Sequence, residues 1–596
     1  MLALVLLAPF DWAAYGRDAG GARFVPDCAI TRANVARLRP AWNFHTGDLS
    51  DGEGKPFSAF ECTPILADGT LLVVTPFSRV FALDPDTGKR RWVYDPKIVK
   101  NRPASVIAFA ARGVSTWKDP KTGRTRVLLA TFDARLIALD LATGKPIPSF
   151  GRAGTIDLRT GVVQNRASLC CTSPPLIVGS TVVVGSCIAD DFAAEMPAGT
   201  VRAFDVRTGR AAWTWRPVRG GAGNAWAPLS ADPARGLVFV PTGSQSPDFY
   251  GGSRPGNDEN ADSVTCLRAA TGRPVWSFQT VHHDLWNYDV PAQPILTDVK
   301  GKPAAVVLTK MGHVFVLDRL TGRPILPVEE RRVPPSDVSG EKASPTQPFP
   351  TIRLDPDRFV PWGRDEASRA KMAARVKPYR AEGMFTPPSA EGTLIFPGGI
   401  GGANWSGGSV DPITGTLFVN TNRMAFVAAL LPRAEFERAK AARVGGLSAQ
   451  RGVPYGVRQI WLMGPGSTPG NAPPWGVLHA VDLATGKERW DVPLGVHPAL
   501  RGRSEAKAWG SPNLGGSFVT NTGLVFIAAA MDGVLRAFDA RDGSVLWSAP
   551  LPAGGNAAPM SYRSPKTGAT FVVQCAGGHH GLGSPEGDSV VAFRLE

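Results

Sequence analysis

The stretch TVHHDLWNYDVPAQP at residues 280–294 carries more polar and aromatic chemistry than a connecting loop requires. It places two histidines, two aspartates, a tryptophan and an asparagine between strand-like runs. His283, Asp284 and Asp289 are groups that can exchange protons, whereas the amide of Asn287 cannot act as a general base near neutral pH. In an extended segment, side chains two residues apart point to the same face, so Asn287 and Asp289 are expected to share one. The composition of this stretch indicates a functional site.

Other polar residues stand in turns distributed along the whole chain. Taken singly, each of these residues is typical of an ordinary structural turn. They form one site only if the fold brings their turns together. These candidates are Glu61 (FECTP), Arg112 (ARGVSTW), Thr172 (CCTSPP), Asp190 and Asp191 (GSCIADD), Asn224 and Trp226 (NAWAP), Lys310 (LTKMG), Asn404 and Trp405 (GGANWSGG), and His579 (AGGHHG).

An internal repeat predicts how the turns meet. A strand, an Asp, a Thr-Gly turn, a basic residue and a second strand with Trp recur, as in FALDPDTGKRRW and HAVDLATGKERW. Gly supplies the positive φ of a hairpin turn, and Asp accepts backbone hydrogen bonds there. The motif recurs about every 50–65 residues, which makes eight units when a unit near 410–420 is counted. The sequence therefore predicts an all-β fold, an eight-bladed β-propeller with tryptophan-docking repeats, in which turns on one face converge on the axis. An open solenoid of β-repeats is the alternative.

Two regions interrupt the repeat. Residues 321–395 are rich in proline and contain the helix-like RDEASRAKMAARV, and residues 431–475 contain the helix-like RAEFERAKAARV. We expect two long irregular insertions into a single propeller domain that spans residues 11–596.

The bulk composition excludes several classes of protein. The net charge is +14, but the basic residues recur singly after the Thr-Gly turns, and no recognition helix or zinc finger appears, so no nucleic-acid partner is expected. No CxxC or CxxCH motif is present, which argues against structural zinc and covalent haem. The adjacent Cys170 and Cys171 permit a vicinal disulfide, and two buried thiols are the alternative. Residues 1–10 carry an apolar run that is too short to span a bilayer and resembles the remnant of a signal peptide, so we expect an exported, periplasmic protein, soluble or peripheral to the membrane.

The motifs HHDLWxYDVPAQP, NWxGxSVDP and AGGHHG, together with the tryptophan-docking blades, resemble those of the pyrroloquinoline quinone (PQQ) dehydrogenases. The membrane-bound glucose, quinate and polyol dehydrogenases are the most similar group. The resemblance runs from DWAAYGRD at residue 11 to the C-terminus, with the motifs in the family's order.

The resemblance implies a site for PQQ, a flat trianion with an ortho-quinone. Trp226 matches the family's stacking floor. Arg112 and Thr172 match positions that bind the cofactor's carboxylates, with Glu61 and Asn224 beside them. Lys310 matches the cation beside the quinone carbonyl. The remaining implied contacts are Asn404, Trp405 and His579.

The resemblance also implies a Ca²⁺ ion held by oxygen ligands, with a lanthanide as the alternative. Asp190 falls where the family places its acidic ligand, and Asp191 is a second candidate. Ser244 stands where methanol-type enzymes have an asparagine, and its neutral oxygen is a weaker ligand.

Asn287 departs from the family. The residue that follows this tryptophan is there an aspartate that takes the substrate's hydroxyl proton. Three interpretations remain. Asp289 serves as base, as metal ligand or as both; His283 or Asp284 supplies the base; or the protein binds PQQ without turning over.

Two functions follow from these patterns. The first is a PQQ- and Ca²⁺-dependent dehydrogenase that oxidises a sugar, polyol or cyclic alcohol and passes electrons to ubiquinone or another external acceptor. The second is a non-catalytic propeller that acts as a scaffold or a cofactor-binding module. The set of cofactor-type positions favours the enzyme, whereas Asn287 and Ser244 favour the scaffold.

Overall fold

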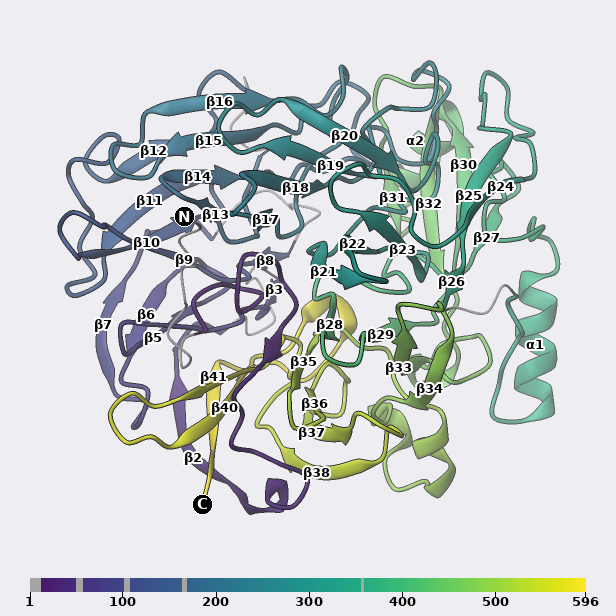
Figure 1. Cartoon of the computed structure of the whole chain (residues 1–596). Coiled ribbons are helices and arrows are strands. Elements are labelled where there is room, and N and C mark those ends of the chain that lie inside the picture. The colour runs from purple at the N-terminus through teal and green to yellow at the C-terminus, as the bar shows by residue number, and fades with distance from the viewer. Residues whose placement is uncertain (1–11, 50–56, 101–107, 163–168, 355–357) are drawn as a thin grey trace.

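The computed structural model describes residues 12–49, 57–100, 108–162, 169–354 and 358–596. The expected leader at residues 1–10 lies outside these residues. Strands make up nearly all of the regular secondary structure, as the sequence predicts, and Figure 1 shows the sheets arranged around a common centre. Among the described residues, no helix has the length and apolar composition needed to cross a membrane.

Most sheets are built from four strands that follow one another in the chain, which is the arrangement expected of propeller blades. The sheets of the first half are β4 (Ile65–Ala67), β5 (Thr70–Val74), β6 (Val80–Leu83), β7 (Arg90–Tyr94); β9 (Ser115–Lys118), β10 (Thr125–Ala130), β11 (Arg135–Asp140), β12 (Thr155–Asp157); β13 (Leu176–Val178), β14 (Thr181–Val184), β15 (Val201–Asp205), β16 (Ala211–Trp215); and β17 (Ser230–Asp232), β18 (Leu237–Pro241), β19 (Ser263–Arg268), β20 (Pro274–Gln279).

The sheets of the second half accept strands from outside the simple order. They are β21 (Ile295–Val299), β22 (Lys302–Leu308), β23 (His313–Asp318), β26 (Ile352–Arg353); β28 (Gly408–Asp411), β29 (Thr416–Asn422), β33 (Gly476–Asp482), β34 (Glu488–Pro493); β35 (Ser517–Thr520), β36 (Leu524–Ile527), β37 (Val534–Asp539), β38 (Val545–Pro550), with β1 (Phe24–Val25) added; and β39 (Met560–Arg563), β40 (Thr570–Ala576), β41 (Ser589–Leu595), with β2 (Leu38–His45).

The last sheet joins the two ends of the described chain. β2 pairs antiparallel with β41, from Leu38 opposite Leu595 to His45 opposite Ser589. The C-terminal sequence VVAFRLE thus completes a sheet with a strand from the beginning of the described chain.

The tryptophan repeat acts as a contact between neighbouring sheets. The indole Nε1 of Trp92 donates to the carbonyl of Leu141 in the next sheet at 2.8 Å. The ring also covers Gly144, where an added Cβ would lie 2.5 Å from a ring carbon. The same pairing recurs around the ring for Trp42 with Gly88, Trp213 with Gly272, Trp276 with Gly322 and Trp490 with Gly543.

This contact predicts that Gly144→Ala destabilises the protein more than its backbone alone explains. Gly123 has the same φ of +68° as Gly144, but an added Cβ at Gly123 would meet nothing within 4 Å. Gly123→Ala is therefore expected to lower the free energy of unfolding by about 1–2 kcal/mol, the cost of placing a non-glycine residue in the left-handed region. Gly144→Ala adds overpacking against Trp92, about 1–3 kcal/mol more. Urea unfolding midpoints of the two variants measure the difference, and equal midpoints would contradict the docking role.

The two insertions are more regular than expected. They contain the helices α1 (Glu366–Val376) and α2 (Arg433–Ala441), where the sequence predicts helices, and the hairpin of β24 (Val328–Arg332) and β25 (Thr346–Pro350). Together with β30 (Phe426–Pro432), most of which lies between the two insertions, they also build a four-stranded sheet from β27 (Thr393–Ile395), β32 (Tyr455–Trp461) and β31 (Leu447–Ser448). The prediction of irregular insertions was wrong here. The strands β30 and β32 pair with each other although they are separated by α2, and they carry no Thr-Gly turn by which the repeat could have identified them.

Short elements complete the fold. Cys170 and Cys171 are free buried thiols rather than a disulfide. The parallel pair of β3 (Ser58–Ala59) and β8 (Phe109–Ala110) and five 3₁₀ helices are the remaining elements: η1 (Val35–Arg37), η2 (Pro465–Ser467), η3 (Pro498–Leu500), η4 (Ser504–Ala508) and η5 (His580–Leu582).

A buried histidine is expected to make the stability of the fold sensitive to acid. His313 in β23 packs against the rings of Phe315, Phe349 and Phe385, and neither ring nitrogen has a hydrogen-bond partner among the described residues. Burial lowers the pKa of His313 to about 3, with help from Arg353 and Arg331.

The folded pKa of His313 lies below the ordinary value, so its contribution to stability is present above about pH 6.5 and is lost as the pH falls. We expect the loss to reach about 1.4 kcal/mol per pH unit below pH 6.5. His313→Phe removes this part of the acid sensitivity. Urea unfolding of both proteins at pH 7.5 and pH 5 measures it, and parallel losses in the two proteins would refute the assignment.

Candidate functional site

The predicted site residues gather because they occupy the same place in successive sheets. Glu61, Arg112, Thr172, Trp226, Asp289 and Asn404 each stand a few residues before the innermost strand of a sheet, namely β4, β9, β13, β17, β21 and β28. The segments that enter these strands meet at one end of the central axis. They enclose a cavity of about 430 Å³, in the range of small-molecule sites.

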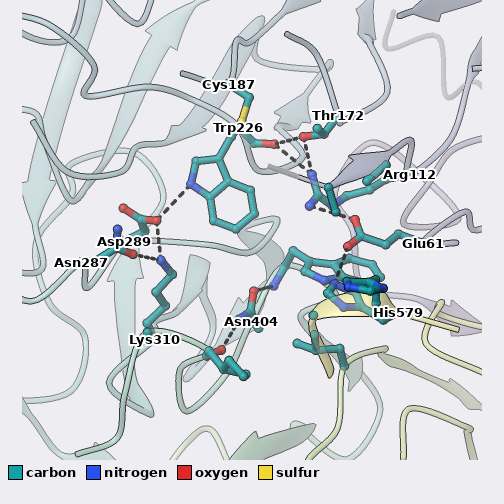
Figure 2. Close-up of a pocket in the computed structure, with 18 of the residues that line it drawn as sticks. Glu61, Arg112, Thr172, Cys187, Trp226, Asn287, Asp289, Lys310, Asn404 and His579 are labelled. Carbon is teal, nitrogen blue, oxygen red and sulfur yellow. Dashed lines mark hydrogen bonds and ion pairs between the residues drawn. The ribbon is translucent and has the colours of Figure 1, made fainter. Parts of the chain in front are cut away.

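The cavity wall contains most of the residues that the sequence singled out. Lys310 joins them from the turn between β22 and β23, and His579 from the segment after β40. The predicted residues that line the cavity are Glu61, Arg112, Thr172, Asp190, Trp226, Asn287, Asp289, Lys310, Asn404, Trp405 and His579. Figure 2 shows the ring of Trp226 between two groups of charged side chains.

The first group is built around Asp289. Its Oδ2 accepts hydrogen bonds from Lys310 Nζ at 2.7 Å and from Trp226 Nε1 at 3.1 Å. Its Oδ1 accepts one from the backbone amide of Ser244 at 2.8 Å. Burial lowers the pKa of Lys310, but the nearby carboxylates of Asp289, Asp190 and Asp248 outweigh it and hold that pKa above its ordinary value. Lys310 is therefore a fixed cation at the cavity wall.

Asn287 bridges an anion and a cation. Its side-chain amide donates to Asp248 Oδ2, and its oxygen accepts a hydrogen bond from Lys310. A carboxylate at this position would be an acceptor only and would face the carboxylate of Asp248. Its φ of +60° lies in the left-handed region, which asparagine tolerates better than most residues. The amide thus fits its surroundings, while it supplies no base.

The second group is built around Arg112. Its guanidinium donates to Thr172 Oγ1 at 2.6 Å and pairs with Glu61 at 2.9 Å. It lies 5.1 Å from the ring centroids of both Trp226 and Trp405. His579 Nε2 lies 3.3 Å from the other oxygen of Glu61. This side of the cavity offers cations and hydroxyls between aromatic faces, a combination suited to the carboxylates of a planar ligand.

Buried carboxylates crowd the first side of the cavity. Burial, followed by repulsion from neighbouring carboxylates, raises the pKa of Asp190 and of Asp248 far above the ordinary value. The same causes raise the pKa of Asp262. Asp248 Oδ1 and Asp262 Oδ2 are buried without a hydrogen-bond partner among the described residues. A cation with oxygen ligands would relieve this repulsion.

Four residues of the predicted site, and Asp284 as the other candidate base, do not line the cavity. Asn224 is buried and exchanges hydrogen bonds with the backbone of Ile188. Asp191 accepts a hydrogen bond from Ser448 at 2.6 Å. Ser244 lies behind Asp289, where its hydroxyl bonds to Asp284.

His283 is the fourth of these residues. Its Nε2 lies 2.9 Å from Glu341 and its Nδ1 lies 2.8 Å from the carbonyl of Gly256. Both ring nitrogens thus face acceptors, and the side chain is buried. His283 fastens the first insertion to the 280–294 loop, and nothing in this placement lets it reach a substrate in the cavity.

The sequence missed Asp248 and Asp262 as neighbours of the site. Leu514 also lines the cavity and stands before β35, the same position that the other site residues occupy in their sheets. Asp248 and Asp262 lie in the long connection between β18 and β19, on which the repeat gives no information.

The comparisons with known proteins agree with this geometry. Residues 12–572 match the PQQ family model described as "Glucose/ethanol/alcohol dehydrogenase, beta-propeller domain". Quinoprotein glucose dehydrogenase A of Acinetobacter calcoaceticus is 36% identical over 642 residues, covering 99% of this chain and 80% of the relative. The quinate/shikimate dehydrogenase (quinone) of Acinetobacter baylyi is 36% identical over 645 residues, covering 98% and 79%. The glycerol dehydrogenase large subunit of Gluconobacter oxydans is 36% identical over 640 residues, covering 98% and 85%.

A solved structure supports the fold. A europium-containing methanol dehydrogenase superposes with a TM-score of 0.73 at 21% identity, covering 99% of this chain and 98% of the other. The family match and the identities span nearly the whole chain, and the relatives are named as dehydrogenases. The chain therefore belongs to the PQQ-dependent, or quinoprotein, dehydrogenases and is an enzyme.

Proposed function

We propose that the protein oxidises a CH–OH group of a sugar, polyol or cyclic alcohol with PQQ and Ca²⁺, and that Asp289 is its general base. The observation that carries this proposal is the contact of Asp289 with both Lys310 and Trp226 at the cavity wall. The relatives named above act on glucose, on quinate or shikimate, and on glycerol, which supports this substrate class.

The residues present suit the cofactor. Trp226 and Trp405 offer flat faces, Arg112 and Thr172 offer donors for carboxylates, and Lys310 offers a cation on the opposite side. When bound, PQQ supplies the quinone that accepts two electrons from the alcohol. The chain's own part is to hold the substrate carbon against that quinone and to remove the hydroxyl proton.

The residues present also suit a hard cation. Asp190 and Asp289 line the cavity, and the buried carboxylates behind them repel one another. Ca²⁺ prefers such oxygen ligands, and a lanthanide ion is the alternative. Ser244 lies against Asp289, whereas Asp191 is engaged with Ser448, so the proposal rests on Asp190 and Asp289.

Asp289 is the cavity-lining carboxylate best placed for proton removal. Glu61 is engaged by Arg112 and His579, and Asp289 contacts Lys310. Donors from three directions fix its orientation, which is a requirement for efficient proton transfer.

The wider setting is part of the proposal. Electrons pass to ubiquinone or another external acceptor, and the protein is periplasmic, soluble or peripheral to the inner membrane. The relatives include an enzyme whose name specifies a quinone, which supports this acceptor. The sheets that follow the repeat support eight blades.

Dye-linked oxidation by purified protein tests the proposal. The protein is reconstituted with PQQ and either Ca²⁺ or La³⁺ and is offered glucose, quinate, glycerol and ethanol. We expect dye reduction only with PQQ and a metal, and faster with a polyhydroxylated or cyclic substrate than with ethanol. PQQ binding without turnover under either metal would refute the assignment of Asp289 as a working base.

A further inference from the structure

The N-terminal crossing segment, residues 12–23, ties the centre of the fold together. Its backbone carbonyls accept hydrogen bonds from the innermost strands of five different sheets. The segment therefore crosses the middle of the ring before the chain reaches β2, as Figure 1 shows in dark purple. The five bonds run from Leu66 to Trp12 (2.9 Å), Ala231 to Ala19 (2.8 Å), Leu296 to Gly20 (2.8 Å), Val410 to Ala22 (2.9 Å) and Val519 to Arg23 (3.0 Å).

Arg23, the last residue of this segment, has a buried guanidinium. It is 1% exposed, and its backbone has a φ of +49°, in the region that favours glycine. Its guanidinium donates to the carbonyl of Ser406 and lies 4.7 Å from the ring centroid of Tyr15. No carboxylate of the described residues forms an ion pair with it. A buried cation without a counterion is costly, so such a group is retained where an anion compensates it.

The position of Arg23 connects it to the cavity. Ser406 follows Trp405, which lines the cavity, and the Ser406 hydroxyl donates to Gly515, the neighbour of the cavity-lining Leu514. A Cβ at Gly516 would lie 2.5 Å from the Arg23 guanidinium. The side chain is thus enclosed by the two loops that carry Trp405 and Leu514.

Tyr15 relates Arg23 to the second charged group of the cavity. Burial raises the pKa of the Tyr15 phenol, Arg23 and Arg112 lower it, and Glu61 raises it, so the phenol lies within electrostatic range of all three. The charge of Arg112 is balanced by its ion pair with Glu61. Arg23 therefore adds a positive charge, without an ion pair among the described residues, behind the loops that carry Trp405 and Leu514.

We propose that Arg23 is a positioning residue of the cofactor site, whose charge is compensated when an anionic cofactor occupies the cavity. The inference rests on the proposed use of PQQ, a trianion. Arg23 contributes long-range attraction through a protein interior of low dielectric, where such interactions are stronger than in water. Its hydrogen bond to Ser406 holds the loop that carries Trp405.

Two substitutions separate charge from hydrogen bonding. Arg23→Gln keeps a donor for Ser406 without charge, and Arg23→Lys keeps a charged donor. PQQ affinity is measured by equilibrium dialysis with Ca²⁺ present. We expect Arg23→Gln to raise the dissociation constant at least tenfold and Arg23→Lys less than threefold, with the substrate KM of PQQ-saturated enzyme unchanged in both variants.

Arg319→Gln is the matched control, because Arg319 is a largely buried guanidinium at the sheet contact of Trp276 with carboxylate partners Asp232 and Asp298. We expect it to leave PQQ affinity unchanged. If Arg23→Gln does not fold, Arg23→Met provides the second uncharged variant.

Three results would overturn the inference. Equal PQQ affinity in Arg23→Gln and the wild type would do so, as would equal losses in the Lys and Gln variants, which would assign the effect to packing. A wild type that binds no PQQ would overturn the proposed cofactor and this inference together, and that result is distinct from the first two.

Discussion

Asp289→Asn is expected to lower kcat by about 10²–10⁴-fold, the usual contribution of a positioned acid–base group. The amide has nearly the shape of the carboxylate, and its oxygen can still accept from Trp226 and Lys310, while its NH2 group then faces the backbone N–H of Ser244. What it loses is the ability to hold the substrate's proton and to contribute charge to a metal. Dye-linked kcat and PQQ affinity are measured together, and we expect the first to fall far more than the second.

Asp140→Asn is the control, because Asp140 is a buried carboxylate in a Thr-Gly turn, away from the cavity. A kcat within tenfold of the wild type in Asp289→Asn would remove Asp289 from the proton-transfer step. Adding Asn287→Asp to the Asp289→Asn variant restores a carboxylate beside Lys310, because Asn287 is the other residue that accepts a hydrogen bond from Lys310. We expect at least a tenfold recovery of kcat.

The second large effect is expected from Lys310→Met. Lys310 is the cation that contacts both Asn287 and Asp289, and Asp190 and Asp248 lie close enough to raise its pKa. Its removal leaves these carboxylates without a counterion and, under the proposed function, removes the charge that would stabilise the reduced cofactor. We expect kcat/KM to fall about 10²–10³-fold, as for loss of one electrostatic contact to the transition state.

The stability of Lys310→Met should also acquire a pH dependence. Without the cation, the raised folded-state pKa values of Asp190 and Asp248 rise further, so stability relative to the wild type falls as the pH increases above about 4. Urea midpoints at pH 5 and pH 8 measure this. Lys118→Met, which removes an exposed lysine paired with Asp68, is the control. Equal effects of the two variants on kcat/KM would contradict the role of Lys310.

The repeat predicted the fold well because its physics is local. Each Asp and Gly of the motif forms its own turn, and Trp92 reaches Gly144 of the next unit through a contact that recurs wherever both residues are present. The prediction of irregular insertions was wrong in the region that lacks the repeat motif. The strands β30 and β32 pair across the helix α2, and no spacing in the sequence announces such a partner.

The sequence predicts which residues line the cavity better than it predicts how those residues contact one another. Loops that enter successive innermost strands must converge, so the lining positions of Arg112 and Trp226 follow from the repeat once its face is known. The second layer could not be found in this way. That Asp248 faces Asn287, or that Glu341 holds His283 away from the cavity, depends on side chains from connections with no fixed length.

The pairing of β2 with β41 has a consequence for how the molecule is made. Leu38 lies opposite Leu595, so β2 cannot be fully paired until β41, more than 500 residues later in the sequence, has been synthesised. Forming a contact between residues so far apart in the sequence costs loop-closure entropy, and this cost slows the final folding step. Until that seam closes, β2 exposes an unpaired edge. A circular permutant in which a short loop connects β41 directly to β2 should therefore fold faster than the protein with its natural order of strands.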